Sequence, residues 1–188
     1  MELIRKITEI LSRIGQRDKL TENFIFPYSS DPKIKREQIW NNLQKGLLFE
    51  DNQTFIPWQT PYNYVRKFEI KRHDSGDRTN WYLGKRKILD GYEGHFEVMK
   101  WCWYSWRKPI KEISENIGHD LEGMKNFRFL ETHITNLLGE PIKKELEKFG
   151  SLDIGEVIWR NKNVTIRLIG IEIFNCRYQF KIGINEKE

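Results

Sequence analysis

The chain has little cysteine and no long apolar run. Its only cysteines, Cys102 and Cys176, are far apart and form no CxxC pair, so we expect no cysteine-based metal framework. The sequence leaves a single disulfide open but does not imply one. No apolar run approaches the roughly 18 residues that span a bilayer. The charged first 15 residues also lack the apolar core of a secretory signal. We therefore expect a reduced, cytoplasmic protein with no membrane partner.

The chain also lacks a strong excess of either charge. Its 32 basic and 27 acidic residues give a formal charge of +5, and the densest basic run is Lys85–Lys87. Nucleic-acid-binding tails carry about five or six consecutive like charges, so these short runs indicate a solvated surface. A phosphate-binding face is the lesser alternative. Aromatic residues make up 13% of the chain, which excludes a disordered protein and predicts a packed core.

Several motifs of catalysis are missing. The chain has no glycine-rich phosphate loop, GxSxG elbow, HExxH helix or EF-hand loop, which excludes the enzyme classes built on them. His95-Phe96-Glu97 matches the HxE order of zinc deaminases, but the PCxxC segment with the other zinc ligands does not follow. We therefore expect His95 and Glu97 to share one face of a strand and to hydrogen-bond to each other or to solvent.

Two short His-Asp pairs lie in segments that the sequence predicts to be loops. His73 and Asp74 are followed by Asp77, and the pair at 119–120 is followed by Glu122. Such groups act as metal ligands or as acids and bases when they converge around one substrate. Nothing in the sequence requires that convergence. We expect no metal and no cofactor, and keep an enzyme acting on nucleic acid or nucleotides as an alternative.

Three stretches have apolar residues at helical spacing. The first covers residues 3–14. The second begins at Asp31 as N-cap with Pro32 at the first helical position, and it runs to about residue 46. The third has its apolar residues between 124 and 138, and it places His133 on its solvent side.

Shorter elements lie between these helices. Residues 47–56 predict a hairpin, and a short aromatic helix follows Pro61. The polar segment 69–80 is the most loop-like part of the chain. Residues 109–120 indicate an amphipathic turn or two of helix, and PIKKELEKF at 141–149 fits either a short helix or an edge segment.

A tryptophan-rich stretch at 94–104 predicts one long strand, preceded by two short strands with a turn near Gly84. Neither face of the long strand is polar at its tryptophan end, so we expect it to be central and covered on both sides. A platform that stacks bases or sugars is the alternative. At the end of this strand, Trp106 stands beside Arg107 and Lys108, and we expect it to be exposed.

The C-terminal third predicts three antiparallel strands at 155–160, 164–174 and 177–184, the last with one apolar and one polar face. The whole chain therefore indicates an α+β fold, with a largely antiparallel sheet covered by helices. We expect one domain over residues 1–188, with a two-helix part at 1–46 and a sheet-containing body at 47–188. A faint helix-plus-meander echo between the two halves leaves an internal duplication open.

The segment FLETHITNLLGEP, the strands GEVIW, VTIRL and RYQFKI, and the corner IPWQTP resemble a pattern in small bacterial α+β proteins. Some of these resemble immunity proteins of polymorphic-toxin or contact-dependent inhibition systems. The resemblance implies a protein that binds and blocks a cognate toxin, and it brings no catalytic residue set.

These observations favour a non-catalytic protein-binding protein, namely an immunity-type inhibitor of a bacterial toxin. Abundant charges of both signs suit steered association, and a basic inhibitor fits an acidic toxin surface. A nucleic-acid-binding module and the enzyme described above are the alternatives. The candidate contacts lie in the charged segment 69–80 and at the end of the tryptophan-rich strand: Arg72, His73, Asp74, Asp77, Arg78, Trp106, Arg107 and Lys108.

Overall fold

The structure is a computed structural model, and it describes residues 24–58, 60–65, 67–68, 70–75, 78–101, 108–172 and 175–185, without the side chains of Asn63 and Trp101. The expected helix at 3–14 lies outside these residues. The described elements are α2 (Pro32–Lys45), β1 (Gly46–Phe49), β2 (Thr54–Pro57), α3 (Tyr62–Val65), β3 (Lys71–Ser75), β4 (Arg78–Ile88), β5 (Tyr92–Trp101), β6 (Glu112–His119), α4 (Asp120–Leu138), β7 (Lys143–Phe149), β8 (Leu152–Asn161), β9 (Val164–Glu172) and β10 (Cys176–Ile184).

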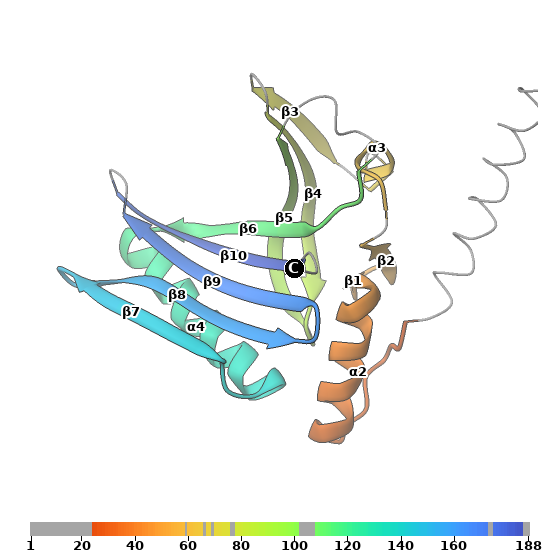
Figure 1. The fold of residues 1–188 in the computed structure, drawn as a ribbon, viewed down its shortest axis with the longest axis horizontal. Coiled ribbons are helices and arrows are strands. Elements are labelled where there is room, and N and C mark those ends of the chain that lie inside the picture. The colour runs from red at the N-terminus through yellow and green to blue at the C-terminus, as the bar shows by residue number, and fades with distance from the viewer. Residues whose placement is uncertain are drawn as a thin grey trace, which may run out of the picture.

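Eight of these strands form one sheet in the order β3-β4-β5-β6-β10-β9-β8-β7, and neighbouring strands run antiparallel (Figure 1). This confirms the α+β fold with an antiparallel sheet, and it confirms the C-terminal meander as β8, β9 and β10. The expected central position of the tryptophan-rich strand is wrong. Strand β5 is third from one edge, because β10 returns to pair with β6 and places those two strands in the middle.

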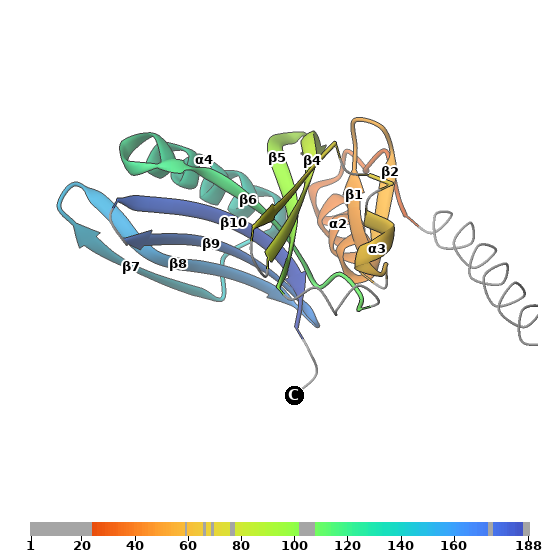
Figure 2. The same cartoon turned by 90° about the horizontal axis from the view of Figure 1, so that it is seen from above.

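Helix α4 packs on one face of β6, β10, β9 and β8, which we call the inner face (Figure 2). The helix predicted around residues 124–138 is thus confirmed. Its buried side meets the apolar residues of β10, with the rings of Phe127 and Tyr178 5.6 Å apart. Gly123 lets the helix approach β6 closely, since a Cβ at that position would lie 2.6 Å from the carbonyl carbon of Gly118. Burial of such aromatic rings supplies much of the stability of the fold.

The N-terminal elements pack against the inner face of β4 and, through the rings of Phe49 and Phe96, against β5, and α2 contacts the C-terminal end of α4. Asp31 caps α2 by accepting hydrogen bonds from the backbone N–H groups of Lys33 and Ile34 at 2.8 and 3.1 Å, as expected from the sequence. Strands β1 and β2 form the predicted hairpin. On α3, the ring of Tyr62 stacks on Trp81 of β4 at 5.7 Å. The buried side chains of these elements and of α4 form one continuous core.

The predicted loop at 69–80 is wrong, because β3 and the start of β4 form a hairpin there. All five residues of β3 are exposed, since this strand lies at the edge of the sheet. An edge strand with both faces in solvent has no apolar alternation, so its composition resembles that of a loop. The predicted turn near Gly84 is also wrong: Gly84 forms a bulge within the continuous strand β4.

The helical turns expected within 109–120 are wrong as well, because residues 112–119 form β6. Ile113 and Ile117 both face inward, and Glu115 between them also faces inward as a buried residue. A register shift beside Ile117 disturbs the pairing with β10. Because a carboxylate occupies one of the inward positions, the apolar residues of this strand do not alternate along the sequence. Those that remain are three to four residues apart, which is the spacing of a helix.

The segment that fitted either a helix or an edge strand is the edge strand β7. The prediction that the tryptophan-rich stretch is buried falls largely outside the described residues, because 102–107 are not among them. Within β5, Phe96 and Val98 face inward and are buried. The internal duplication stays a prediction. No helix in the described part of the chain is long and apolar enough to cross a membrane.

Candidate binding surface

The second face of the eight-stranded sheet carries no helix or strand among the described residues, and we call it the open face (Figure 2). The pairing register aligns one side chain from each strand in a continuous row across it. From β3 to β7 this row is Lys71, Tyr82, Glu97, Ser114, Lys181, Arg167, Ile158 and Lys143. Cross-strand neighbours on one face lie about 5 Å apart, so the row is a contiguous, mostly polar band.

Positive charge gathers where β6, β10 and β9 meet on the open face. Arg167 and Lys181 pair directly across two strands, and they line a small hollow of about 130 Å³ together with Lys111. The Nζ of Lys181 also contacts a carboxylate oxygen of Glu112 at 3.1 Å. Among the described residues that line this hollow, Lys111, Arg167 and Lys181 are cations and Glu112 is a carboxylate.

Negative charge gathers at the β7 side of the same sheet. A groove of about 610 Å³ is lined by four carboxylates and by two isoleucines, Ile154 and Ile171. Lys143 lies beside this groove and contacts Glu145 at 2.8 Å and Glu156 at 2.7 Å. The carboxylates that line the groove are Glu145, Glu147, Glu156 and Glu172.

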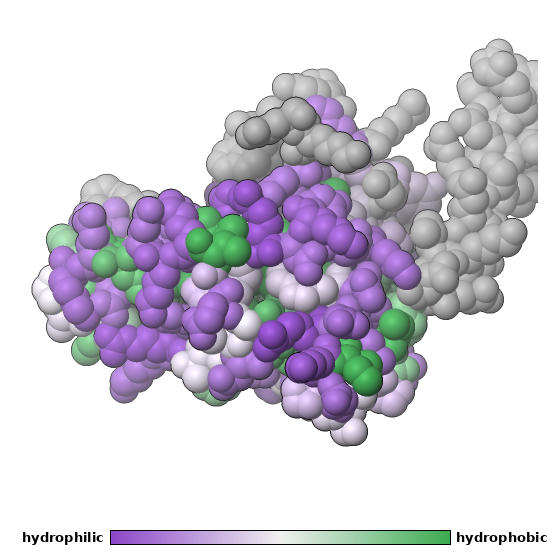
Figure 3. Space-filling view, turned by 60° about the horizontal axis from the view of Figure 1, so that its bottom comes forward, coloured by the Kyte–Doolittle hydropathy of each residue, from purple (hydrophilic) through white to green (hydrophobic). Residues whose placement is uncertain are grey.

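Hydrophobic side chains do not form a large patch on the molecular surface drawn in Figure 3, where green residues are scattered among purple ones. Three exposed hydrophobic residues belong to the open face: Tyr82, Phe149 and Ile171 are 38%, 49% and 39% exposed. Phe149 and Ile171 lie toward the β7 side of the sheet, and Tyr82 lies on β4 near the other side. The open face is therefore a largely polar surface with charges of both signs, and its few exposed hydrophobic residues are of the kind that occur singly on most protein surfaces.

The structure brings several of the predicted contact residues together on the β3–β4 hairpin. The Arg72 guanidinium contacts the Asp74 carboxylate at 2.9 Å, and the Thr79 hydroxyl donates to the same carboxylate at 2.6 Å. The hydrogen bond from Thr79 and the neighbouring Arg72 lower the pKa of Asp74. The side chain of His73 lies on the other face of β3, and His73 pairs with Asn80 of β4. The hairpin is therefore a charged, exposed extension of the sheet.

The remaining predicted contacts are only partly described. Arg78 begins β4 opposite Ser75. Lys108 is exposed, and its backbone carbonyl accepts a hydrogen bond from Tyr62 at 3.1 Å, which joins this segment to α3. Asp77, Trp106 and Arg107 lie outside the described residues.

The His-Asp pairs do not converge. His73 is on edge strand β3 and His119 ends β6, three strands away, which separates them by roughly 14 Å across the sheet. His119 lies within 3.4 Å of the Asn175 side chain, and the Asp120 carboxylate accepts the backbone N–H of Cys176 at 3.1 Å. This second pair therefore ties the start of α4 to β10, and the geometry gives no support to a shared catalytic site.

The other two histidines also have structural surroundings. His95 is exposed on β5, and Glu97 accepts a hydrogen bond from the Asn80 amide at 2.8 Å. The expected solvent position of His133 is wrong: it is half-buried, with Nε2 2.7 Å from the carbonyl oxygen of Leu89. The imidazole of His133 on α4 is therefore hydrogen-bonded to the backbone of the turn that carries Leu89.

Two buried carboxylates hold the β4–β5 hairpin in place. Glu50 accepts hydrogen bonds from the backbone N–H groups of Asp90 and Gly91, both at 2.8 Å, at a turn that contains positive φ angles. Glu115 accepts the Tyr92 hydroxyl and the His95 backbone N–H, both at 2.7 Å. Burial raises the pKa of both glutamates. All the hydrogen-bond donors named here belong to the protein itself, so both carboxylates have a structural role.

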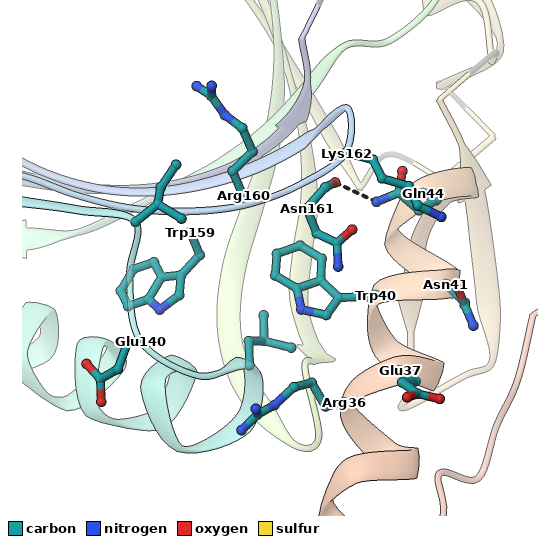
Figure 4. Close-up of a pocket in the computed structure, with 12 residues that line it drawn as sticks. Arg36, Glu37, Trp40, Asn41, Gln44, Glu140, Trp159, Arg160, Asn161 and Lys162 are labelled. Carbon is teal, nitrogen blue, oxygen red and sulfur yellow. Dashed lines mark hydrogen bonds between the residues drawn. The ribbon is translucent and has the colours of Figure 1, made fainter.

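A cleft of about 480 Å³ separates α2 from β8 and the C-terminal end of α4, and we call it the α2–β8 cleft (Figure 4). Trp40 of α2 and Trp159 of β8 project into it from opposite sides. The Trp159 indole N–H donates to the carbonyl oxygen of Gly139 at 2.9 Å. Arg36 donates from Nε to the carbonyl oxygen of Leu137 at 3.2 Å, which places a cation at the negative end of the α4 dipole. Arg160 connects the rim of the cleft to the open face.

The sequence alone did not identify the residues that line the open face and the α2–β8 cleft. The polar alternation of the last strand marks Lys181 as outward-facing, which is a signal in the sequence. No local signal shows that Lys181 pairs with Arg167, or that Trp40 faces Trp159. Both arrangements depend on contacts between segments distant in the chain.

The described residues contain no group of three or more His, Cys, Asp or Glu side chains arranged to hold a metal ion. Comparison of the chain with protein-family models, curated proteins and solved structures gives no match.

Proposed function

We propose that this protein is a non-catalytic binding protein, of the immunity type, that inhibits a bacterial toxin by covering its active site with the open face of the sheet. The observation that carries the proposal is the continuous polar row across eight antiparallel strands, on a face that no described helix covers. A sheet packed against a helix on its other face holds the backbone that carries these side chains in one arrangement, which removes the cost of ordering that backbone on binding.

The separation of charge on the open face supports recognition of one particular partner. Arg167 and Lys181 form the positive part, and the carboxylates around Lys143 form the negative part. Complementary potentials accelerate encounter and oppose wrong partners, because like charges brought together cost several kcal/mol. A partner with an acidic region opposite Arg167 and a basic region opposite Glu156 would fit this pattern.

The test is coexpression with any secreted toxin that is encoded beside the gene of this protein. We expect cell survival to require the wild-type chain, and the two proteins to elute as one complex in size-exclusion chromatography. The double charge reversal Arg167→Glu with Lys181→Glu should abolish survival and weaken the complex at least tenfold. The matched control Lys33→Glu with Lys125→Glu changes two exposed cations of the helices α2 and α4, and it should leave both readouts unchanged.

The same proteins separate this proposal from nucleic-acid binding. If the wild-type chain binds RNA or DNA with a log affinity that falls steeply with log salt, and binds none of these toxins, the proposal is wrong. Equal loss of protection in both double variants would also contradict it, because net charge alone would then explain the effect.

A further inference from the structure

We infer that the α2–β8 cleft binds a carboxylate, and that its source is an aspartate or glutamate side chain of the protein partner. The inference rests on the proposed function for that source. The site is distinct from the open face but adjoins it, because Arg160 lies at the edge of both. Three observations support it: an indole without a hydrogen-bond acceptor, a guanidinium with unused donors, and the arrangement of charge around the cleft.

The indole of Trp40 is the first observation. The residue is 8% exposed, and its Nε1–H donates to no group in the part of the chain that the structure describes. Trp58 and Trp159 differ, because their indole N–H groups donate to the carbonyl oxygens of Leu43 and Gly139. Buried indole N–H groups usually have an acceptor. Since Trp40 projects into the cleft, an oxygen atom bound there would supply the missing one (Figure 4).

The guanidinium of Arg36 is the second observation. Arg36 and Trp40 are four residues apart on α2, so both project from the same side of the helix into the cleft. Only Nε of Arg36 has a hydrogen-bond acceptor among the described residues, the carbonyl oxygen of Leu137. Its Nη groups therefore remain available. A carboxylate accepts hydrogen bonds at two oxygens and donates none, so it can accept from the Trp40 indole N–H and from the Arg36 guanidinium at the same time.

The charges around the cleft are the third observation. Arg36, Arg160 and Lys162 line it against two acidic residues, Glu37 and Glu140. Figure 4 shows the Glu37 carboxylate and the Arg160 guanidinium both directed away from the space between Trp40 and Trp159. The lining has a positive excess of one charge, three cations against two carboxylates. The chain carries a formal charge of +5, which favours an acidic partner.

The continuity between the cleft and the open face identifies the source of the carboxylate. Arg160 pairs with Thr165 of β9 on the open face and also lines the cleft. A protein that covers the open face therefore reaches the rim of the cleft. A side chain extending from that protein would enter between Trp40 and Lys162, where a carboxylate would be partly desolvated and held by charge-assisted hydrogen bonds.

The first experiment uses sodium acetate as the probe and the indole ¹H–¹⁵N signals of the full chain as the readout. Trp40→Phe assigns the signal of Trp40. We expect a saturable downfield shift of that signal with acetate and none with sodium chloride at equal ionic strength. Arg36→Gln should weaken the apparent affinity for acetate roughly tenfold, whereas the control Lys33→Gln, on the same helix, should not. An unchanged Trp40 signal, or an equal or larger response to inorganic phosphate, would overturn the carboxylate assignment.

The second experiment measures complex formation with the toxin partner. Trp40→Phe and Arg36→Gln should each raise its Kd about tenfold while the far-ultraviolet circular dichroism stays unchanged. If Trp40→Phe fails to fold, Arg36→Gln alone decides, since Arg36 is exposed. An unchanged Kd would reject the partner's side chain as ligand and leave the proposed function intact. Acetate binding in a chain that binds no toxin would instead reject the proposed function and the partner as source.

Discussion

On β10, the inner and open faces of the sheet alternate residue by residue. Tyr178, Phe180 and Ile182 are at most 1% exposed under α4, whereas Arg177 and Lys181 point to the other side and carry charge. The two faces share one backbone and one set of hydrogen bonds. The inner face therefore supplies most of the packing, and we expect the exposed charged residues of the open face to contribute little to stability.

The largest difference between the faces should appear when an inner aromatic ring is removed. Phe180 is fully buried, and its ring lies 5.8 Å from that of Tyr92 and 6.4 Å from that of Phe96. Phe180→Ala should lower the free energy of unfolding by about 3–5 kcal/mol in urea titrations, because it leaves a cavity in the core. Phe180→Leu keeps most of the volume and should cost about 1 kcal/mol. A loss below 1 kcal/mol for Phe180→Ala would show that the inner face is not tightly packed.

A substitution that adds one methyl group tests the closeness of α4 to the inner face. In a solvent-facing helix position, Gly→Ala stabilises by about 0.5–1 kcal/mol. At Gly123 the new Cβ would lie 2.6 Å from both Gly118 and the ring of Tyr178. Gly123→Ala should therefore lower the free energy of unfolding by about 1–3 kcal/mol, with thermal unfolding as the readout. Asn136→Ala, on the exposed side of α4, is the control and should change it by less than about 0.5 kcal/mol. Stabilisation by Gly123→Ala would contradict the close approach.

The buried carboxylate of Glu115 predicts a pH dependence that belongs to the inner face. Burial raises its folded-state pKa above the unfolded value, so the folded protein binds this proton at a higher pH. Its contribution to stability is therefore complete below the unfolded pKa and is lost as the pH rises through the folded pKa. The free energy of unfolding of the wild type, minus that of Glu115→Gln, should increase as the pH falls from 7.5 to 4.5. A difference that does not vary with pH would contradict this assignment. Burial also raises the pKa of Glu50, but Glu50 is present in both proteins, so its contribution cancels when the two free energies of unfolding are subtracted.

The smallest effects should come from the open face. Arg167→Ala and Gln179→Ala remove polar side chains whose neighbours remain hydrated, so each should change the free energy of unfolding by at most about 0.5 kcal/mol. Urea titration of both variants, beside Phe180→Ala, gives the comparison directly. A loss above 2 kcal/mol in either variant would mean that the open face also takes part in folding.

The inner face was the more predictable part of the molecule. Helices α2 and α4 have caps or long apolar periods, and β8 to β10 alternate clearly, so each was legible from local sequence. Strand β6 was missed because Glu115 occupies an inward position, and β3 because none of its residues is buried. The causes differ: β3 has no buried face, whereas the buried face of β6 is interrupted by a carboxylate, and in both strands the apolar residues therefore do not alternate with a period of two.

The open face and the cleft were less predictable for a different reason. Lys181 and Arg167 are polar residues of unremarkable spacing, and they become neighbours only when β9 and β10 pair in one particular register. Trp40 and Trp159 line the same cleft because α2 packs beside the end of α4. Sites of this kind depend on long-range contacts, which the sequence pattern of a single segment does not contain.

The two outermost strands restrict how anything can attach to this molecule. Strand β7, with the sequence KKELEKF, and strand β3, with the sequence KRHDS, both place lysines along the rim of the sheet. Lysines at such positions oppose the addition of a further strand from another polypeptide, whether a second copy or a misfolded neighbour. Pairing of a further strand with either edge of the sheet is thereby disfavoured.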